Sequence, residues 1–320
     1  MENRLFFVLV FFATLFFLVN AGGSVGSLDT DQPPLADVVI TFPDPNFEAA
    51  VREVTEKQAG DITRVDVENV IELDVSDLGI KDLSGIEYFT ALETLYCGWN
   101  GLTELDVSQN ESLKMLDCSD DPEYDGGLTT LDVSRNQLLT VLYCSGNQLT
   151  TLELSNNSLL EELVCDDNQM TMIDMSQNLA LTELYCRDNL LTELVLHSNS
   201  ALKYLACDRN QLLMLDVSYN STLEELHCSR NLIKVLDISQ NAALRVLMCQ
   251  GNQLMALDVS QSPALTKIYC GKNQLTELDV SQNSALESLF CENNHMRSRS
   301  AIIGLNEDRL SSFSFDPQDF

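Results

Sequence analysis

Hydrophobic and polar positions recur along this chain with a period of 21 residues. Residues 265–285 show one unit, LTKIYCGKNQLTELDVSQNSA, with the pattern L-x-x-L-x-C-x-x-N-x-L-T-x-L-D-V-S-x-N. Side chains alternate across a strand, so we expect Leu95 and Cys97 to face inward while Tyr96 faces outward. Each unit therefore predicts a short strand that ends at its cysteine.

The ten cysteines mark this period. Eight of the nine intervals between them are 21 residues long, and the interval from Cys118 to Cys144 is 26. A fixed period near 20 residues indicates one structural unit copied along an axis, so we predict one solenoid rather than two globular domains. The cysteines are Cys97, Cys118, Cys144, Cys165, Cys186, Cys207, Cys228, Cys249, Cys270 and Cys291.

Two columns of asparagine accompany the cysteines. The first column follows each cysteine by three residues, as at Asn147 and Asn210. The second follows each LDVS segment, as at Asn110 and Asn199, and Ser262 interrupts it. An asparagine amide both donates and accepts, so a buried column can satisfy backbone groups where the chain turns. We expect both columns to be structural.

The first half of the unit matches the leucine-rich-repeat signature, with cysteine at an apolar position. The LDVS half repeats the alternation of the strand, with Val107 inward and Asp106 outward. A unit of 21 residues leaves little room for a helix on the outer side. We therefore predict a β-rich, right-handed leucine-rich-repeat solenoid, with short extended or irregular segments opposite the cysteine strands.

Residues 71–92, IELDVSDLGIKDLSGIEYFTAL, resemble a repeat of the bacterial internalin-type leucine-rich proteins. Residues 42–70 resemble the small helical N-terminal cap of that family, and the tail from Ile302 resembles the segment that closes such arrays. The resemblance aligns Val75 with Cys97 and implies that the cysteine strands form a continuous concave sheet. It also implies a role in adhesion or host interaction.

The N-terminus has the layout of an export signal. A segment of fifteen residues at 5–19, apolar except for Thr14, precedes Asn20-Ala21-Gly22-Gly23, whereas a membrane span needs about 20. We expect a cleaved signal peptide and a secreted or cell-surface protein; a retained signal anchor is the alternative. The predicted segments are a signal peptide (1–21), a linker (22–40), a helical cap (41–70), the repeats (71–296) and a closing segment (297–320).

The charge of the chain excludes some classes of partner. The sequence has 49 acidic and 18 basic residues and a net charge of −31. This balance argues against nucleic acid and against an anionic membrane surface as partners. It is compatible with cationic partners, with divalent cations, and with a solvated surface that binds neither.

We expect the cysteines to pack rather than to react. Neighbours in register lie about 4.8 Å apart with parallel side chains, whereas a disulfide needs a Cβ–Cβ distance of about 3.8 Å. A straight column also cannot offer the four converging ligands of a zinc site. The histidines are His197, His227 and His295, and a residue copied ten times cannot be one nucleophile. We predict no enzyme, no catalytic residue, no bound metal and no cofactor.

An acidic row follows the second half of the repeats. Neighbouring carboxylates 4.8 Å apart repel each other by about 0.9 kcal/mol in a water-like dielectric. Serine hydroxyls, backbone donors, counterions or calcium could relieve this repulsion, and we favour a hydrogen-bonded, solvated row because calcium needs six to eight converging oxygens. The row contains Asp106, Asp132, Glu153, Asp174, Asp216, Asp237, Asp258 and Asp279, and Val195 interrupts it.

The outward position between each leucine and cysteine is rich in aromatic residues, and we expect it to bind a partner. Aromatic residues on a solenoid's sheet suit recognition, although they also suit exposed strand positions in general. The five extra residues of the long repeat fall within 119–127, which forms an acidic loop near Trp99, the one tryptophan. A tolerated surface insertion is the alternative there. The predicted partner-binding residues are Tyr96, Trp99, Tyr124, Tyr143, Tyr185, Tyr204, Tyr269 and Phe290.

The sequence therefore predicts an exported, non-enzymatic leucine-rich-repeat protein. It would bind a protein or a glycan through its concave face and the 119–127 loop. The alternative is a structural or spacer protein of the cell envelope without a discrete ligand. No acid–base pair or nucleophile–base set in the sequence stands out from the repeat background.

Overall fold

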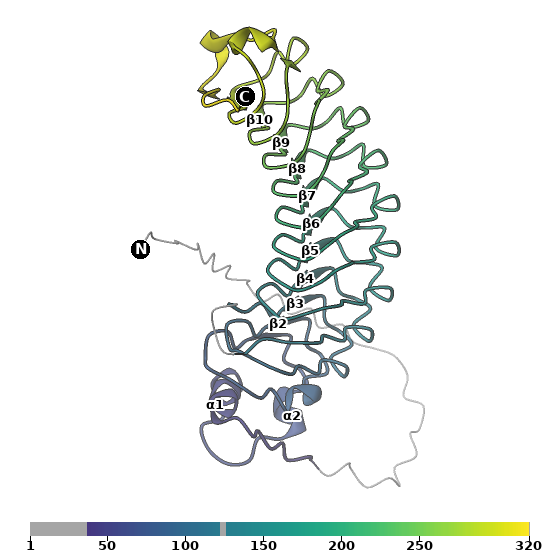
Figure 1. The fold of residues 1–320 in the computed structure, drawn as a ribbon. Coiled ribbons are helices and arrows are strands. Elements are labelled where there is room, and N and C mark those ends of the chain that lie inside the picture. The colour runs from purple at the N-terminus through teal and green to yellow at the C-terminus, as the bar shows by residue number, and fades with distance from the viewer. Residues whose placement is uncertain (1–36, 122–125, 320) are drawn as a thin grey trace, which may run out of the picture. The chain divides into compact units, whose positions relative to one another are not determined.

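A computed structural model of the chain describes residues 37–121 and 126–319. The predictions for the signal peptide, for residues 22–36 of the linker and for Tyr124 fall outside these residues. Asp37–Phe320 form one compact unit, in which the chain winds through stacked repeats (Figure 1). Within this unit the stack curves, and the strands follow its inner side.

Twelve strands form one parallel sheet in chain order, in which β10 (Lys267–Tyr269) pairs with β12 (Ser288–Phe290) and β12 pairs with β14 (Ser312–Ser314). Leucine or isoleucine stands at the centre of the repeat strands and is buried, as at Leu95 and Ile268. The strands are β1 (Glu72–Asp74), β2 (Thr94–Tyr96), β3 (Met115–Asp117), β4 (Val141–Tyr143), β5 (Glu162–Val164), β6 (Glu183–Tyr185), β7 (Tyr204–Ala206), β8 (Glu225–His227), β9 (Val246–Met248), β10 (Lys267–Tyr269), β12 (Ser288–Phe290) and β14 (Ser312–Ser314).

Hydrogen bonds between repeats continue beyond these three-residue strands. The amide of Cys207 donates to the carbonyl of His227 (2.8 Å), and the amide of Arg209 donates to that of Ser229 (2.8 Å). The two residues after each cysteine are therefore held by the same ladder as the strand itself. This matters for the functional site, because side chains beyond the strands are also stacked in register.

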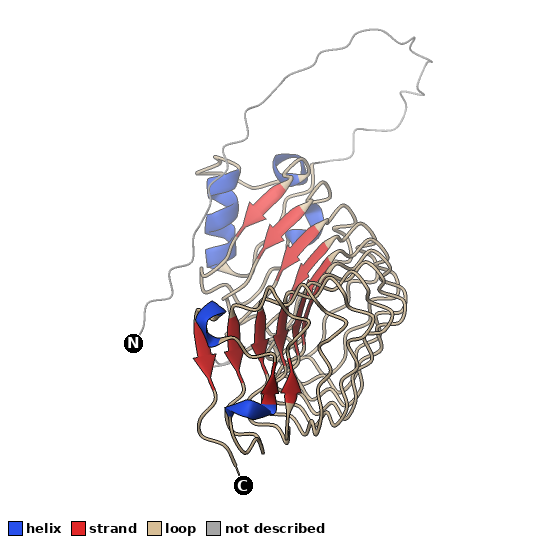
Figure 2. Ribbon diagram, turned by 90° about the horizontal axis from the view of Figure 1, so that it is seen from above, coloured by secondary structure: helices blue, strands red, loops and turns tan. Residues whose placement is uncertain are grey.

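The N-terminal cap contains two helices, α1 (Pro45–Val54) and α2 (Arg64–Val67), and the 3-10 helix η1 (Ile86–Tyr88) follows β1 (Figure 2). Asp44 caps α1 by accepting from the amides of Asn46 (2.8 Å) and Phe47 (3.3 Å). Phe47 is fully buried and stacks on Phe89 of the first repeat, with ring centroids 6.4 Å apart. The cap thus closes the apolar interior at that end.

The outer side of the repeats is mostly irregular, as the repeat length predicts. Its regular elements are the short pair β11 (Leu278–Asp279) and β13 (Ile302–Ile303) and an isolated bridge between Asp174 and Val195. The helices η2 (Arg299–Ala301) and η3 (Glu307–Arg309) precede β14 at the C-terminal end. None of the helices among the described residues has the length and apolar character that a membrane crossing requires.

The interior is built from the predicted columns. The cysteines are all buried and free, and Val75 takes the cysteine position in the first repeat, also fully buried. Each asparagine of the first column closes a turn with both ends of its amide: Asn210 accepts from Leu191 N (2.9 Å) and donates to the carbonyl oxygens of Cys186 (2.8 Å) and Cys207 (3.2 Å). The predicted leucine-rich-repeat solenoid with short N-terminal helices is confirmed.

Candidate partner-binding site

We call the side of the 12-stranded sheet that carries the first and third residues of each strand the sheet face. The third residues are in register from repeat to repeat, so that Tyr96 pairs with Asp117 and Asp117 with Tyr143. Further along, Tyr269 pairs with Phe290. The predicted outward row therefore exists as a physical column on one surface.

The aromatic side chains of this column are half-buried rather than fully exposed. The prediction of an exposed stripe needs this correction, and its cause is packing within the face. The rings of Tyr269 and Phe290 stack with centroids 4.8 Å apart and planes 5° apart. Ala206 stands between Tyr185 and His227 in the same column and is fully covered.

Tyr185, Arg187, Tyr204 and His227 form a connected cluster at the middle of the sheet face. The rings of Tyr185 and Tyr204 stack 4.6 Å apart, and the Arg187 guanidinium lies 5.2 Å from the centre of the Tyr185 ring. Arg187 Nη2 donates to the Tyr204 hydroxyl (2.9 Å), which also lies 3.1 Å from His227 Nδ1. These contacts fix the rings before any partner arrives, so little side-chain entropy would be lost on binding.

Two aspartates hold the arginine of this cluster. Asp166 lies 3.3 Å and Asp208 lies 3.5 Å from Arg187, one on each side. Burial raises the pKa of Asp166 to about 6, although Arg187 and its amide oppose that shift. Burial also lowers the pKa of His227. The cluster is therefore a desolvated polar network on the sheet face.

Tyr143 belongs to the N-terminal part of the face. Its hydroxyl donates to Glu162 Oε1 on the next strand (2.8 Å), and burial together with this carboxylate raises the pKa of the phenol. Asp117 separates Tyr143 from Tyr96, so the two tyrosines are not in direct register. The predicted patch of Tyr96, Trp99, Tyr124 and Tyr143 is thus spread over three strands, with Tyr124 outside the described residues.

Trp99 lies two residues beyond Cys97, and 45% of its surface is exposed. Its amide donates to the carbonyl of Ser119 (2.8 Å), which places it beside the first residue of the 119–127 insertion. Its φ is +62°, a left-handed backbone that a bulky side chain adopts at a cost of about 1–2 kcal/mol. Asp, Asn or Gly takes the corresponding position in several other repeats, so folding gives no reason for tryptophan here.

The described ends of the insertion are anchored to its neighbours. The amide of Asp120 donates to the carbonyl of Ser145 (2.8 Å), and Gln148 Nε2 donates to that of Gly126 (2.6 Å). Gly126 packs so closely on Gly101 that a Cβ atom would lie 2.7 Å from the Gly101 oxygen, so only glycine fits. Both ends of the insertion are therefore fixed to the surface of the solenoid.

Sequence reasoning missed some polar members of this surface, above all Arg187 and the arginines at 209 and 230. A signal for Arg209 and Arg230 was present in the position two residues after each cysteine. That position is Gly or Asp in several repeats, but Arg209, Arg230 and Lys272 interrupt this pattern. Strand-based reasoning stops at the cysteine, whereas the hydrogen-bond ladder extends past it.

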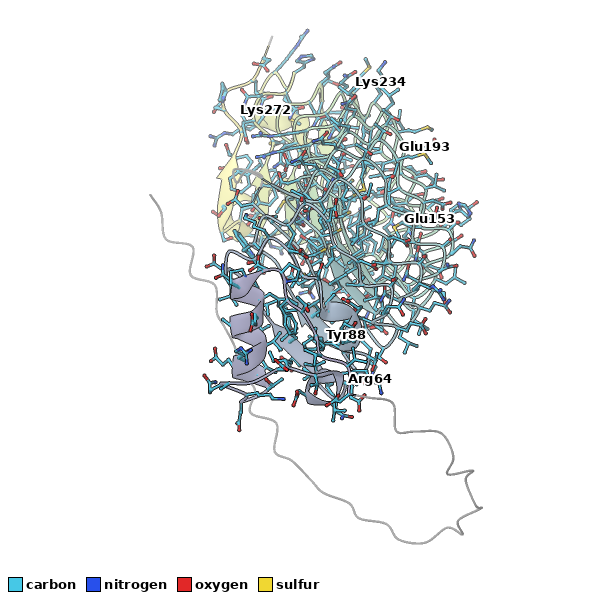
Figure 3. All side chains as sticks on the ribbon, turned by 90° about the horizontal axis from the view of Figure 1, so that it is seen from below. Arg64, Tyr88, Glu153, Glu193, Lys234 and Lys272 are labelled. Atoms are coloured by element: carbon cyan, nitrogen blue, oxygen red, sulfur yellow. The ribbon has the colours of Figure 1, made fainter. Side chains whose placement is uncertain are left out.

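The acidic row on the outer side is satisfied locally. Asp106 Oδ1 accepts from the Ser108 amide (2.9 Å), and donation from the Ser108 side chain and amide lowers the pKa of Asp106. Glu153 belongs to this row and lies with Glu193 and Lys234 on the outer side of the repeats (Figure 3). Among the described residues, no group of three or more His, Cys, Asp or Glu side chains is placed to hold a metal ion.

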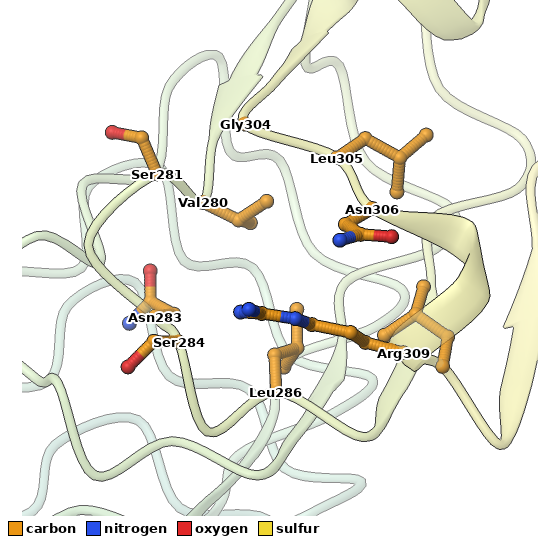
Figure 4. Close-up of a pocket in the computed structure, with 10 residues that line it drawn as sticks. Val280, Ser281, Asn283, Ser284, Leu286, Gly304, Leu305, Asn306 and Arg309 are labelled. Carbon is orange, nitrogen blue, oxygen red and sulfur yellow. The ribbon is translucent and has the colours of Figure 1, made fainter.

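A small cavity of about 80 Å³ lies under the closing segment (Figure 4). Val280 and Leu286 of the last full repeat face Leu305 and Arg309 across it. Its volume is well below the roughly 300 Å³ at which ligand sites begin. We therefore assign this cavity to the packing of the C-terminal end.

The chain resembles internalins of Listeria monocytogenes in sequence and in fold. No family model matches it. A stretch of 70 residues, 22% of the chain, is 41% identical to Internalin J of serotype 4b (strain F2365) and corresponds to 8% of that protein. The functional domain of InlJ, whose structure includes a cysteine ladder, matches 80% of this chain at 40% identity with a TM-score of 0.76. That match covers 56% of the InlJ structure, so this chain spans about half of it.

A second solved structure supports the fold alone. The internalin InlF from Listeria monocytogenes (strain 4b F2365) has a TM-score of 0.72 at 22% identity, over 89% of this chain and 93% of that one. The InlJ match adds the cysteine column itself to the shared features. The InlJ domain includes a cysteine ladder, and this chain has a column of ten buried cysteines.

Proposed function

Since the chain is an internalin-like leucine-rich-repeat protein with buried cysteines in 21-residue repeats, we propose that it acts by binding a protein partner through its sheet face and the 119–127 loop. Internalin-family proteins are typically surface proteins that interact with a host. We place this chain, accordingly, outside the cell, secreted or at the cell surface, and in adhesion or host interaction. Catalysis is not part of the proposal.

The observation that carries the proposal is the aromatic content of the sheet face, which the fold does not require. The interior columns are nearly invariant from repeat to repeat, whereas the third strand residue varies from Tyr to Asp, Val, Ala, His, Met and Phe. Interfaces are enriched in tyrosine, tryptophan and arginine, and the central cluster and Trp99 supply all three. A protein is favoured over a glycan because the aromatic rings lie along many repeats rather than in one closed cavity.

Trp99→Asn tests the proposal at its most exposed aromatic residue. Asparagine tolerates the left-handed backbone, so the melting temperature should stay the same or rise. The affinity for a partner isolated with the wild-type protein should fall about tenfold or more, as for a hot-spot residue. Surface plasmon resonance measures the affinity, and differential scanning calorimetry measures the melting temperature.

Tyr219→Asn is the matched control, because Tyr219 is an exposed aromatic residue outside the sheet face. It should leave partner affinity unchanged. A combined Tyr185→Ala and Tyr269→Ala variant extends the test along the face and separates binding from a spacer role. A spacer would keep its function in every one of these variants, and that result would refute the proposal.

A further inference from the structure

A polar pocket lies beside the sheet face, on the residues that follow the cysteines of four neighbouring repeats. Its volume is about 360 Å³, within the range of small-ligand sites. The same ladder that orders the strands holds it, since the amide of Arg230 donates to the carbonyl of Gln250 (2.8 Å). The residues that line it are Arg187, Asp188, Asp208, Arg209, Ser229, Arg230 and Gln250.

Two polar side chains in this lining have unused hydrogen-bonding capacity. Ser229 is only 4% exposed, and its hydroxyl finds no hydrogen-bond partner among the described residues. Gln250 Oε1 is likewise covered and unpartnered. Leaving a buried polar group unpaired costs about 1–3 kcal/mol, which a ligand could recover.

The arginines of the pocket differ in whether an aspartate forms an ion pair with them. Arg187 is held between Asp166 and Asp208, and Arg209 lies 3.2 Å from Asp188. Arg230 is exposed and makes no ion pair with any described residue. The lining has three arginines and two aspartates, a formal charge of +1 in a chain whose net charge is −31. Asp166, which also pairs with Arg187, balances this charge, so the positive charge available to a ligand is that of Arg230.

The backbone conformation at Arg209 and Arg230 indicates that folding does not favour arginine at these two positions. Arg209 has φ +54° and Arg230 has φ +55°. The same position is glycine at Gly146 and Gly251, which adopts such a backbone without strain. A long side chain is retained where glycine would be more stable.

The same repeats also expose apolar side chains on the segment that follows. The two residues at positions six and seven after the cysteine are Thr-Thr or Thr-Glu in several other repeats, but here they are Leu213-Met214, Lys234-Val235 and Met255-Ala256. Met214, Val235 and Met255 are 70%, 75% and 69% exposed. Exposed apolar side chains in consecutive repeats favour a peptide over a sugar as the occupant.

We propose that this pocket binds a carboxylate of an acidic segment in a protein partner. The planar guanidinium of Arg230 matches a carboxylate with two parallel hydrogen bonds, and the Ser229 hydroxyl supplies another donor. One guanidinium without an ion pair suits a singly charged carboxylate better than a doubly charged phosphate. The apolar side chains of the same repeats would contact apolar neighbours of that acidic residue. This inference rests on the proposed function, because it takes the partner to be a protein.

Fluorescence anisotropy with two labelled peptides tests the inference, one alternating Glu and Leu and the other alternating Gln and Leu. The wild-type protein should bind the Glu peptide about tenfold more tightly than the Gln peptide, since a charged hydrogen-bonded pair is lost in the second. Arg230→Asn should remove this preference while its left-handed backbone remains tolerated. Ser229→Ala should weaken binding of the Glu peptide without changing that of the Gln peptide.

Lys272→Asn is the matched control. Lys272 occupies the same position two repeats away, with φ +54°, but does not line the pocket. It loses the same charge and should keep the preference for Glu. Equal binding of both peptides to the wild-type protein, or equal losses in the Arg230 and Lys272 variants, would overturn the inference. If either result were obtained while the wild-type protein still bound its isolated partner, the sheet-face proposal would stand. The pocket proposal and the sheet-face proposal can therefore fail separately.

Discussion

Each cysteine in the middle of the solenoid lies between cysteines of the two adjacent repeats and is closed off from solvent. Burial raises the pKa of the Cys144 thiol to about 12, and it raises the pKa of Cys207 well above the ordinary value of 9.0. A thiol is nucleophilic only as the thiolate, so these side chains are inert near neutral pH. At this scale cysteine acts as a small apolar residue.

Thiol labelling checks this directly. At pH 8, iodoacetamide should modify the native protein very slowly and the urea-unfolded protein rapidly, because only the unfolded thiols reach the reagent and ionise. The number of modified cysteines at each time is measured by intact-protein mass spectrometry. Rapid modification of most thiols in the native state would contradict the structure.

The same thiols make stability depend on alkaline pH. Their folded pKa is raised, so the folded state retains protons that the unfolded state loses. Their contribution to stability is complete below pH 9.0 and declines as the pH rises towards about 12. The free energy of unfolding in urea should therefore decrease from pH 8.5 to pH 10.5, more steeply than in a variant with Cys144, Cys165 and Cys186 replaced by alanine. Parallel pH profiles would contradict this assignment.

Among individual residues, the sequence was most informative where side chains are copied. The burial of cysteine and of both asparagine columns followed from period and alternation alone. The partners of Arg187 and the left-handed backbone of Trp99 could not be predicted, since they depend on contacts between repeats that no periodic pattern contains. For the same reason the degree of burial of Tyr185 and Tyr269 could not be predicted from the sequence.

At the scale of the element, the second asparagine column joins one repeat to the next. Asn199 is fully buried, and its Nδ2 donates to the carbonyls of Met175 (3.1 Å) and Asn178 (2.9 Å). Its Oδ1 has no partner among the described residues. At Ser262 the hydroxyl takes over this role, 3.1 Å from the Asn241 carbonyl. The second asparagine column therefore needs a side-chain hydrogen-bond donor, which either an asparagine amide or a serine hydroxyl can supply.

Substitution of Asn199 tests which group matters. Asn199→Ala removes two hydrogen bonds to buried carbonyls, each of which keeps one backbone donor, and should lower the free energy of unfolding by about 2 kcal/mol. Asn199→Ser restores one donor and should lose about 1 kcal/mol. Asn156→Ala is the control, because Asn156 is exposed and should change little. Urea unfolding measures all three, and a serine variant no more stable than the alanine variant would show that the donor is not the decisive group.

At the scale of the whole molecule, the repeats form a linear array in which each contacts its neighbours and the two ends are closed separately. Strand existence, order and parallel pairing followed from the 21-residue period, because each repeat can bury its leucines only against the next. The arrangement of η2, η3 and β14 at the C-terminal end did not, since residues 297–320 depart from the repeat pattern. The candidate site likewise combines predicted aromatic residues with positions past the strands that the repeat pattern did not identify.

A linear array of this kind should tolerate removal of one complete repeat. Deleting residues 145–165 brings Cys144 into the place of Cys165, so that leucine, cysteine and asparagine columns remain continuous. This variant should fold cooperatively with a slightly lower melting temperature. Deleting residues 145–164, one residue fewer, leaves one extra residue between the buried leucine and asparagine of the rejoined repeat, so the two columns lose their register there and the melting temperature should fall further. Circular dichroism and calorimetry compare the two deletions. If both fold equally well, the period of the buried columns is not what sets the register of the solenoid.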